Sequence, residues 1–145
     1  LYTEDTKFEL GKGAIVRDGS DVTVIACGIM VHKALEAANL LEERLISVRV
    51  VDMRWIKPFD EEAVRKAAIE CKLVCTAEEG AIEGGIGEGI LEALAANPPA
   101  QVPPVLTFGI PDEFVEQGKV SQLHHMLGID AEGMAARIRE KYAEL

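Results

Sequence analysis

The stretch EEGAIEGGIGEGILEAL, from Glu78 to Leu94, has the glycine content of loops that bind phosphate at the start of a helix. A dinucleotide-binding loop requires Gly-x-Gly-x-x-Gly, but Gly89 arrives one residue too early after Gly85 and Gly87. The stretch also lacks the Gly-Lys-Ser/Thr of a P-loop. The spacing therefore favours a structural interpretation, in which the glycines allow a close approach to a neighbouring backbone.

Charge supports the structural interpretation of this glycine turn. The chain has no Lys or Arg between Leu73 and Gly118. The same segment holds eight acidic residues: Glu78, Glu79, Glu83, Glu88, Glu92, Asp112, Glu113 and Glu116. A bound diphosphate would be repelled by these carboxylates. We therefore predict that Gly84, Gly85, Gly87 and Gly89 serve packing, against their own sheet or against another domain.

A second candidate is the connection RWIKPF, which follows a predicted strand. Arg54 and Lys57 come after the carboxyl end of that strand, where α/β folds place ligands. They indicate either an anion site or interdomain ion pairs beside a packed Trp55. The glycine turn also follows a strand end, so both segments are expected on one edge of the sheet. We predict a docking face for other domains or a dimer partner there: Arg54, Trp55, Lys57, Gly84, Gly85 and Gly87.

The histidines are weaker candidates for chemistry. His32 lies at a predicted helix start and favours a structural role over catalysis. His124 and His125 indicate a surface or interface pair more than a metal or acid–base site. The order of residues suggests no Ser/His/Asp or Cys/His arrangement. We predict no catalytic, cofactor-binding or metal-binding residue in this chain.

The three cysteines, Cys27, Cys71 and Cys75, lie in or near apolar runs. Free cysteines of this kind are typical of reduced thiols in a cytoplasmic protein. Cys71 and Cys75 are four residues apart, but no nearby His or Cys completes a zinc site.

A predicted hairpin begins the ordered part of the chain. Ala14 to Arg17 and Val22 to Cys27 have strand character, and Asp18-Gly19 between them is a turn signal. Strands and helices then alternate: a helix at 30–43, a strand at 46–53, a helix after Asp60, a strand at 72–78, a helix at 84–97, a strand at 103–111, and two closing helices capped by Ser121 and Asp130.

This alternation predicts parallel strands with helical crossovers. The expected fold is a single three-layer α/β domain with a mixed, mostly parallel sheet of about five strands. One antiparallel strand lies at an edge, and helices cover both faces. The domain is expected to span residues 11–145, while the polar residues 1–10 are expected to be a linker from a preceding domain.

Composition excludes several partners. The formal net charge is −10, with a pI of about 4.8, whereas nucleic acids and anionic membranes attract clustered Lys and Arg. No apolar run approaches the ~18 residues of a membrane span. The first residues resemble no signal peptide, which predicts a cytoplasmic location. The chain begins at Leu1 rather than Met, which suggests a processed or excised segment.

Four stretches together resemble a known family. In chain order they are FELGKGAIVRDGSDVTVIACG, VRVVDMRWIKPFDEEAV, TAEEGAIEGGIGEGILEAL and GIPDEFVEQGKVSQLHHMLGIDAEGMAARI. Over Phe8 to Tyr142 the chain resembles the C-terminal domain of the thiamine-diphosphate-dependent transketolase superfamily. Within it, the chain is most similar to the 1-deoxy-D-xylulose-5-phosphate synthases, because of MRWIKPFD, Glu-Glu-Gly at 78–80, and IPDEFVEQG followed by LGIDAEGM.

The resemblance implies a role for this chain. Such enzymes have three α/β domains, and the first two hold thiamine diphosphate and Mg²⁺. The third binds no cofactor and packs against the others in a homodimer. The parent enzyme would join pyruvate to glyceraldehyde 3-phosphate with loss of CO₂, for isoprenoid, thiamine and pyridoxal synthesis. Split transketolase small subunits and 2-oxoacid dehydrogenase β-subunits share part of the pattern, and an independent anion-binding module near Arg54 and Lys57 is a further alternative.

Overall fold

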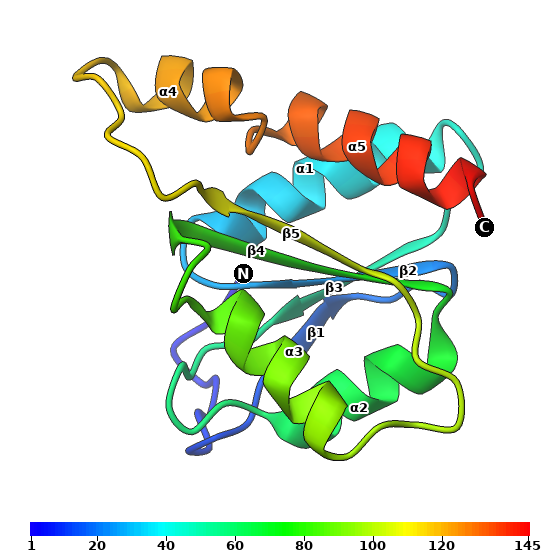
Figure 1. Cartoon of the computed structure of the whole chain (residues 1–145). Helices are drawn as coiled ribbons and strands as arrows, with labels where there is room; N and C mark the ends of the chain where they lie inside the picture. The colour runs from blue at the N-terminus through cyan, green and yellow to red at the C-terminus, as the bar shows by residue number, and fades with distance from the viewer.

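A computed structural model describes all 145 residues and places a five-stranded sheet between two layers of helices (Figure 1). The strand order is β1-β3-β2-β4-β5. Only the β1–β3 pair is antiparallel. The strands are β1 (Ala14–Arg17), β2 (Val22–Ala26), β3 (Val48–Asp52), β4 (Leu73–Ala81) and β5 (Val105–Ile110).

Helices cover both faces of this sheet. One layer contains α1 (Met30–Glu42), α4 (Val120–Leu127) and α5 (Ala131–Ala143), and the other contains α2 (Glu61–Glu70) and α3 (Ile86–Ala96) (Figure 1). The predicted three-layer α/β fold with one antiparallel edge strand is therefore confirmed. None of the helices has the length and apolar character to cross a membrane.

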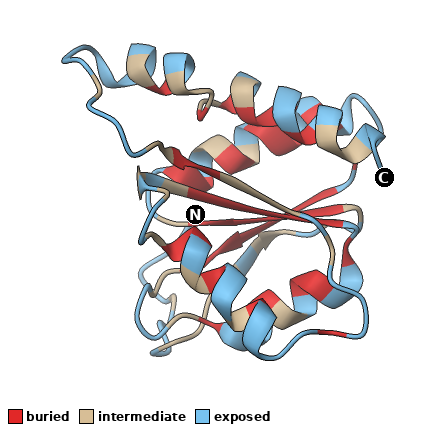
Figure 2. Ribbon diagram, viewed as in Figure 1, coloured by how far each residue is buried: buried red, intermediate tan, exposed pale blue.

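The central strand β2 divides the interior into two cores. All five of its residues are buried (Figure 2). Consecutive side chains of a strand point to opposite faces of the sheet. Val24 belongs to the core beneath α1 and α5, whereas Ile25 belongs to the core beneath α2 and α3. Burial on both faces accounts for the nearly continuous apolar run of this strand.

The predicted pairing of the first two strands is wrong. β1 pairs with β3, with Ile15 opposite Val51, because β3 and β4 occupy both edges of β2. The Asp18-Gly19 turn instead carries the chain past the start of β3. A Cβ atom on Gly19 would lie 2.3 Å from the carbonyl carbon of Val48, so the crossing requires glycine.

Side-chain caps fix two of the helix starts. Asp60 accepts a hydrogen bond from Ala63 N at 3.0 Å, and Asp130 accepts one from Gly133 N at 2.8 Å. Both predicted caps are confirmed. The predicted cap at Ser121 is wrong, because α4 begins at Val120 and has no side-chain cap.

The amino-terminal residues lie against the sheet edge without forming regular structure. Gly13 N donates to Asp60 Oδ2 at 3.0 Å, and Lys12 forms an ion pair with Glu62 at 3.0 Å. Tyr2 donates a hydrogen bond to Asp52 at the end of β3. Through Tyr2, the segment 1–10 that was expected to be a linker contacts the domain at the end of β3.

Candidate functional site

Both predicted segments of the docking face lie at one edge of the sheet, here called the rim. The parallel strands β2, β3 and β4 end there, and the connections that follow them form the rim. Arg54 follows β3, and the glycine turn follows β4. Because β2 lies between β3 and β4, the rim has two halves. We call them the Arg54 pocket (Tyr2, Phe8, Gly28, His32, Asp52, Arg54 and Trp55) and the Glu78 turn (Glu78–Gly89).

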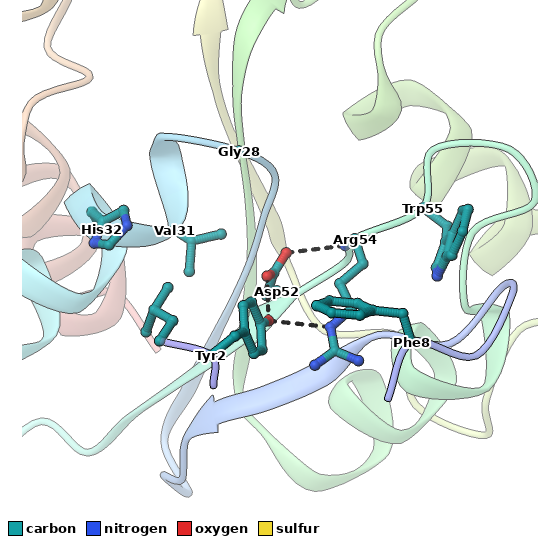
Figure 3. A pocket seen from close by; sticks show the side chains of 9 residues that line it. Tyr2, Phe8, Gly28, Val31, His32, Asp52, Arg54 and Trp55 are labelled. Carbon is teal, nitrogen blue, oxygen red and sulfur yellow. Dashed lines mark hydrogen bonds between the residues drawn. The ribbon is translucent and has the colours of Figure 1, made fainter. Parts of the chain in front are cut away.

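Arg54 is the centre of the first half. Its guanidinium carbon lies 4.6 Å from the ring centroids of both Tyr2 and Phe8, which meet edge to face at 5.3 Å (Figure 3). Arg54 Nε donates to the Tyr2 hydroxyl at 3.1 Å, and its backbone N donates to Asp52 Oδ1 at 3.0 Å. The arginine therefore ties residues 1–8 to the end of β3 through cation–π contacts and hydrogen bonds.

The same contacts explain the backbone conformation of Arg54 and the pKa of the Tyr2 hydroxyl. Arg54 has a φ of 60°, in the left-handed region that residues with side chains seldom adopt, and its bond to Asp52 helps hold it there. Burial, followed by the hydrogen bond to Asp52, raises the pKa of the Tyr2 hydroxyl above its ordinary value. Tyr2 therefore remains a hydrogen-bond donor through the neutral range.

A pocket of about 620 Å³ opens beside Arg54. His32 and Val31 from α1 line one side, and Trp55 lies across from them (Figure 3). The two terminal nitrogens of Arg54 and the ammonium of Lys57 have no acceptor within the chain, and the buried Trp55 Nε1 has no hydrogen-bond partner. The Arg54 and Lys57 nitrogens are available to a partner at this surface, whereas Trp55 Nε1 lies beneath it.

Glu78 organises the second half of the rim. Its two carboxylate oxygens accept hydrogen bonds from Ile86 N and Gly87 N, each at 3.1 Å, at the start of α3. Glu88 Oε2 accepts a bond from Gly84 N at 2.8 Å. A carboxylate from β4 thus takes the place that an anionic ligand has at a phosphate-binding helix. The turn does not fit a diphosphate.

The glycines of this turn make room for that carboxylate. A Cβ atom on Gly85 would lie 2.4 Å from Ala81 O and from both Glu78 oxygens. A Cβ atom on Gly87 would lie 2.7 Å from Thr76 Oγ1. The predicted close approach to a backbone is confirmed for Gly85, and the backbone is that of the domain's own strand β4; at Gly87 the close neighbour is a side chain of β4. Gly84 and Gly89 make no such approach within this chain, because the space around a Cβ atom on Gly84, whose φ is 73°, is open, and a Cβ atom on Gly89 would meet only Phe59 at 3.5 Å.

The other histidines form two separate contacts. His124 is buried, contrary to the expectation of a surface position, and its Nε2 lies 2.9 Å from Glu79 Oε1. The exposed His125 Nδ1 lies 2.7 Å from Asp130 Oδ2. Burial alone would raise the pKa of the Asp130 carboxyl. The hydrogen bonds from Gly133 N and His125 outweigh that effect, so the pKa lies below its ordinary value. No cluster of three or more His, Cys, Asp or Glu is arranged to hold a metal ion.

The cysteine thiols have no disulfide partners. Burial, with the nearby charges of Asp52 and Glu78, raises the pKa of Cys27 to about 12. Burial also raises the pKa of Cys75. Because only the thiolate attacks an electrophile readily, both thiols are poor nucleophiles at neutral pH.

Sequence reasoning did not identify Tyr2, Phe8 and Asp52 as members of the Arg54 pocket. Tyr2 and Phe8 contact Arg54 across about 50 residues of chain, so no local pattern joins them. The available signal for their contact with the domain was the presence of two aromatic residues among the mostly polar residues 1–8.

The chain is a mixed five-stranded α/β domain in which the Glu78 carboxylate occupies the glycine turn at the start of α3. Residues 11–134 match the family described as "Transketolase, C-terminal domain", and the chain belongs to this family.

Among its relatives is 1-deoxy-D-xylulose-5-phosphate synthase 1 of Geobacter sulfurreducens, with 47% identity over 136 residues, covering 94% of this chain and 21% of the relative. The 1-deoxy-D-xylulose-5-phosphate synthase of Vibrio vulnificus is 40% identical over 144 residues, covering 99% of this chain and 22% of the relative. The chain therefore spans about a fifth of the length of these relatives.

Two solved structures share the fold. A chain described as "Split gene transketolase, inactive beta4 tetramer" superposes with a TM-score of 0.89 and 37% identity, covering 98% of this chain and 46% of that chain. A transketolase mutant from Pichia stipitis superposes with a TM-score of 0.69 and 20% identity, covering 92% of this chain and 18% of that chain. The second likeness concerns the fold alone.

Proposed function

We propose that this chain is the C-terminal domain of a thiamine-diphosphate-dependent 1-deoxy-D-xylulose-5-phosphate synthase, a cytoplasmic homodimer. The whole enzyme would join pyruvate to glyceraldehyde 3-phosphate with loss of CO₂. The observation that carries the proposal is identity of 38–47% to proteins of that name along nearly the whole chain.

The domain itself contributes no reacting group in this proposal. Thiamine diphosphate and Mg²⁺ are held by the remainder of the enzyme, and the cofactor supplies the carbanion chemistry. Three local features support this division. Glu78 fills the start of α3, the Cys27 thiol stays protonated, and the Arg54 guanidinium is engaged by two aromatic rings.

The rim docks against the remainder of the enzyme in this proposal. Arg54 and Lys57 supply unpaired cationic nitrogens, the half-buried Trp55 supplies apolar ring surface, and Gly84 presents a turn without a side chain. Gly85 and Gly87 contribute by shaping the same turn around Glu78. Direct contact with a partner would satisfy the polar groups and bury apolar area beside them.

A second candidate is the small subunit of a split transketolase. The likeness to a split-gene transketolase chain, at 37% identity over 98% of this chain, favours it. A 2-oxoacid dehydrogenase β-subunit and an independent anion-binding module remain as alternatives from sequence. The anion-binding module has less support, because Tyr2 and Phe8 cover part of the Arg54 guanidinium.

An assay for CO₂ separates these candidates. The polypeptide that contains this domain is incubated with [1-¹⁴C]pyruvate, thiamine diphosphate and Mg²⁺, with and without glyceraldehyde 3-phosphate. We expect CO₂ release that increases when the aldehyde is added, together with a ketose phosphate product. Transfer of a two-carbon unit from a ketose phosphate, with no CO₂ from pyruvate, would replace the synthase with a transketolase.

A further inference from the structure

The segment 111–127, here called the α4 arm, presents an unusual surface. It consists of the loop after β5 and helix α4, and it projects past the end of the sheet (Figure 1). Most of its residues are exposed (Figure 2). Phe114 is fully exposed in the loop, and Val120 and Met126 on α4 are more than half exposed. Scattered exposed apolar residues are ordinary, but Phe114 is the most exposed large apolar side chain of this chain.

The arm is anchored, so this exposure belongs to a defined structure. The buried His124 contacts Glu79 of β4 at 2.9 Å, and Ile129 N donates to His124 O at 3.0 Å. α4 ends at Gly128, whose φ of 67° suits the left-handed cap of a helix. These contacts fix α4 beside α5 and set the position from which the loop presents Phe114.

Acidic side chains surround the exposed phenyl ring along the chain. Asp112, Glu113 and Glu116 are all exposed, and the neighbouring rim adds the exposed Glu79, Glu83 and Glu88. The basic residues of the arm are Lys119 and the histidines. The complementary surface is therefore an apolar socket for Phe114 with Lys and Arg around it.

A second copy of this surface is a poor occupant. A twofold contact brings the same patch of both copies together, so these carboxylates would face one another. Like charges placed together at an interface oppose binding. The net charge of −10 adds repulsion between copies at longer range.

We propose that the α4 arm docks, through Phe114, into a basic-rimmed apolar socket on the part of the longer polypeptide outside these 145 residues. This rests on the proposed function, in which the chain is one domain of a larger enzyme. Charge complementarity selects a basic surface, and relatives about five times as long supply the additional chain. The arm is separate from the Arg54 pocket, so it adds a second point of attachment.

Hydrogen–deuterium exchange in the full-length polypeptide tests this contact. Phe114→Asp is compared with Leu45→Asp, which adds the same charge at an almost fully exposed apolar residue in the turn after α1. We expect amides 112–119 to be protected in the wild type and to exchange at least tenfold faster in Phe114→Asp. Leu45→Asp should leave their exchange unchanged, and neither variant should change the melting temperature by more than about 2 °C.

Salt and concentration identify the occupant. Protection that weakens between 0.05 and 0.5 M NaCl supports a basic rim, and protection that is insensitive to salt would overturn the charged part of the proposal. Protection that depends on protein concentration would assign the contact to a second copy. Free exchange of the loop in the wild type would overturn the docking. Because none of these readouts uses activity, the outcome is distinct from that of the CO₂ assay.

Discussion

The two halves of the rim use charge in opposite ways. In the Glu78 turn, a carboxylate from β4 occupies the first amides of α3 and closes that helix end. In the Arg54 pocket, the start of α1 has no side-chain cap, and the nearby cation keeps unpaired nitrogens beside a pocket of about 620 Å³. A glycine-rich turn before a helix therefore does not by itself indicate a ligand site. The unpaired cationic nitrogens of this rim lie in its other half, whereas a buried hydroxyl without a partner, Thr76 Oγ1, lies beneath the Glu78 turn.

The largest expected effect comes from filling the space that Glu78 uses. We expect Gly85→Ala to lower the free energy of unfolding by about 2–3 kcal/mol, because its Cβ would lie 2.4 Å from Ala81 O and from both Glu78 oxygens. Urea denaturation measures the change. The matched control is Gly89→Ala, whose Cβ meets only Phe59 at 3.5 Å. It should raise stability by about 0.5–1 kcal/mol, and equal losses in the two variants would refute the packing explanation.

Removing the carboxylate should have the next largest effect. Glu78→Ala leaves Ile86 N and Gly87 N without their acceptors, and we expect a loss of about 1–2 kcal/mol of stability. Thermal denaturation checks it. Glu92→Ala is the control and should be nearly neutral, because Glu92 is an exposed residue of α3. A neutral Glu78→Ala would mean that Glu78 does not stabilise the helix start.

The Arg54 pocket should respond more weakly. Arg54→Lys keeps the charge but loses the planar group that contacts Tyr2 and Phe8, and we expect a cost of about 1 kcal/mol. Residues 1–8 should also detach, which chymotrypsin cleavage after Phe8 detects. Arg44→Lys, at the far end of α1, is the control. Resistance of the Arg54→Lys tail to cleavage would show that other contacts hold it.

The smallest expected effect is a pH dependence of the same pocket. The pKa of Tyr2 is raised in the folded state above its value of about 10 in the unfolded chain. Its contribution to folding stability is therefore fully present below pH 10 and is lost as the pH rises through the higher folded-state pKa. Stability should therefore decline more steeply above pH 10 in the wild type than in Tyr2→Phe. Absorbance titration of tyrosinate gives the pKa, and a value for Tyr2 below 10 would contradict the assignment.

Most of the fold was predictable because its signals are local. Alternating apolar segments and the caps at Asp60 and Asp130 located the strands, the crossovers and two helix starts. The β1 pairing was not predictable in the same way. Asp18-Gly19 resembles a hairpin turn, whereas the partner of β1 is decided by which edge of the sheet remains free.

The candidate site was only half predictable for the same reason. Its acidic surroundings argued against a phosphate in the glycine turn, but they did not identify Glu78 as the group whose carboxylate accepts hydrogen bonds from the start of α3. Tyr2 and Phe8 reach Arg54 only after the sheet brings distant segments together. A single sequence shows the spacing of residues within one segment, but it does not show which distant segments come into contact.

Calorimetric titration of the 145-residue chain with thiamine diphosphate in the presence of Mg²⁺ tests most directly whether the reacting groups lie elsewhere. We predict no saturable heat and no rise in melting temperature, because a ligand that binds the native state must stabilise it. Stoichiometric binding that is lost in a Glu78 or Arg54 variant would contradict a supporting role for this domain.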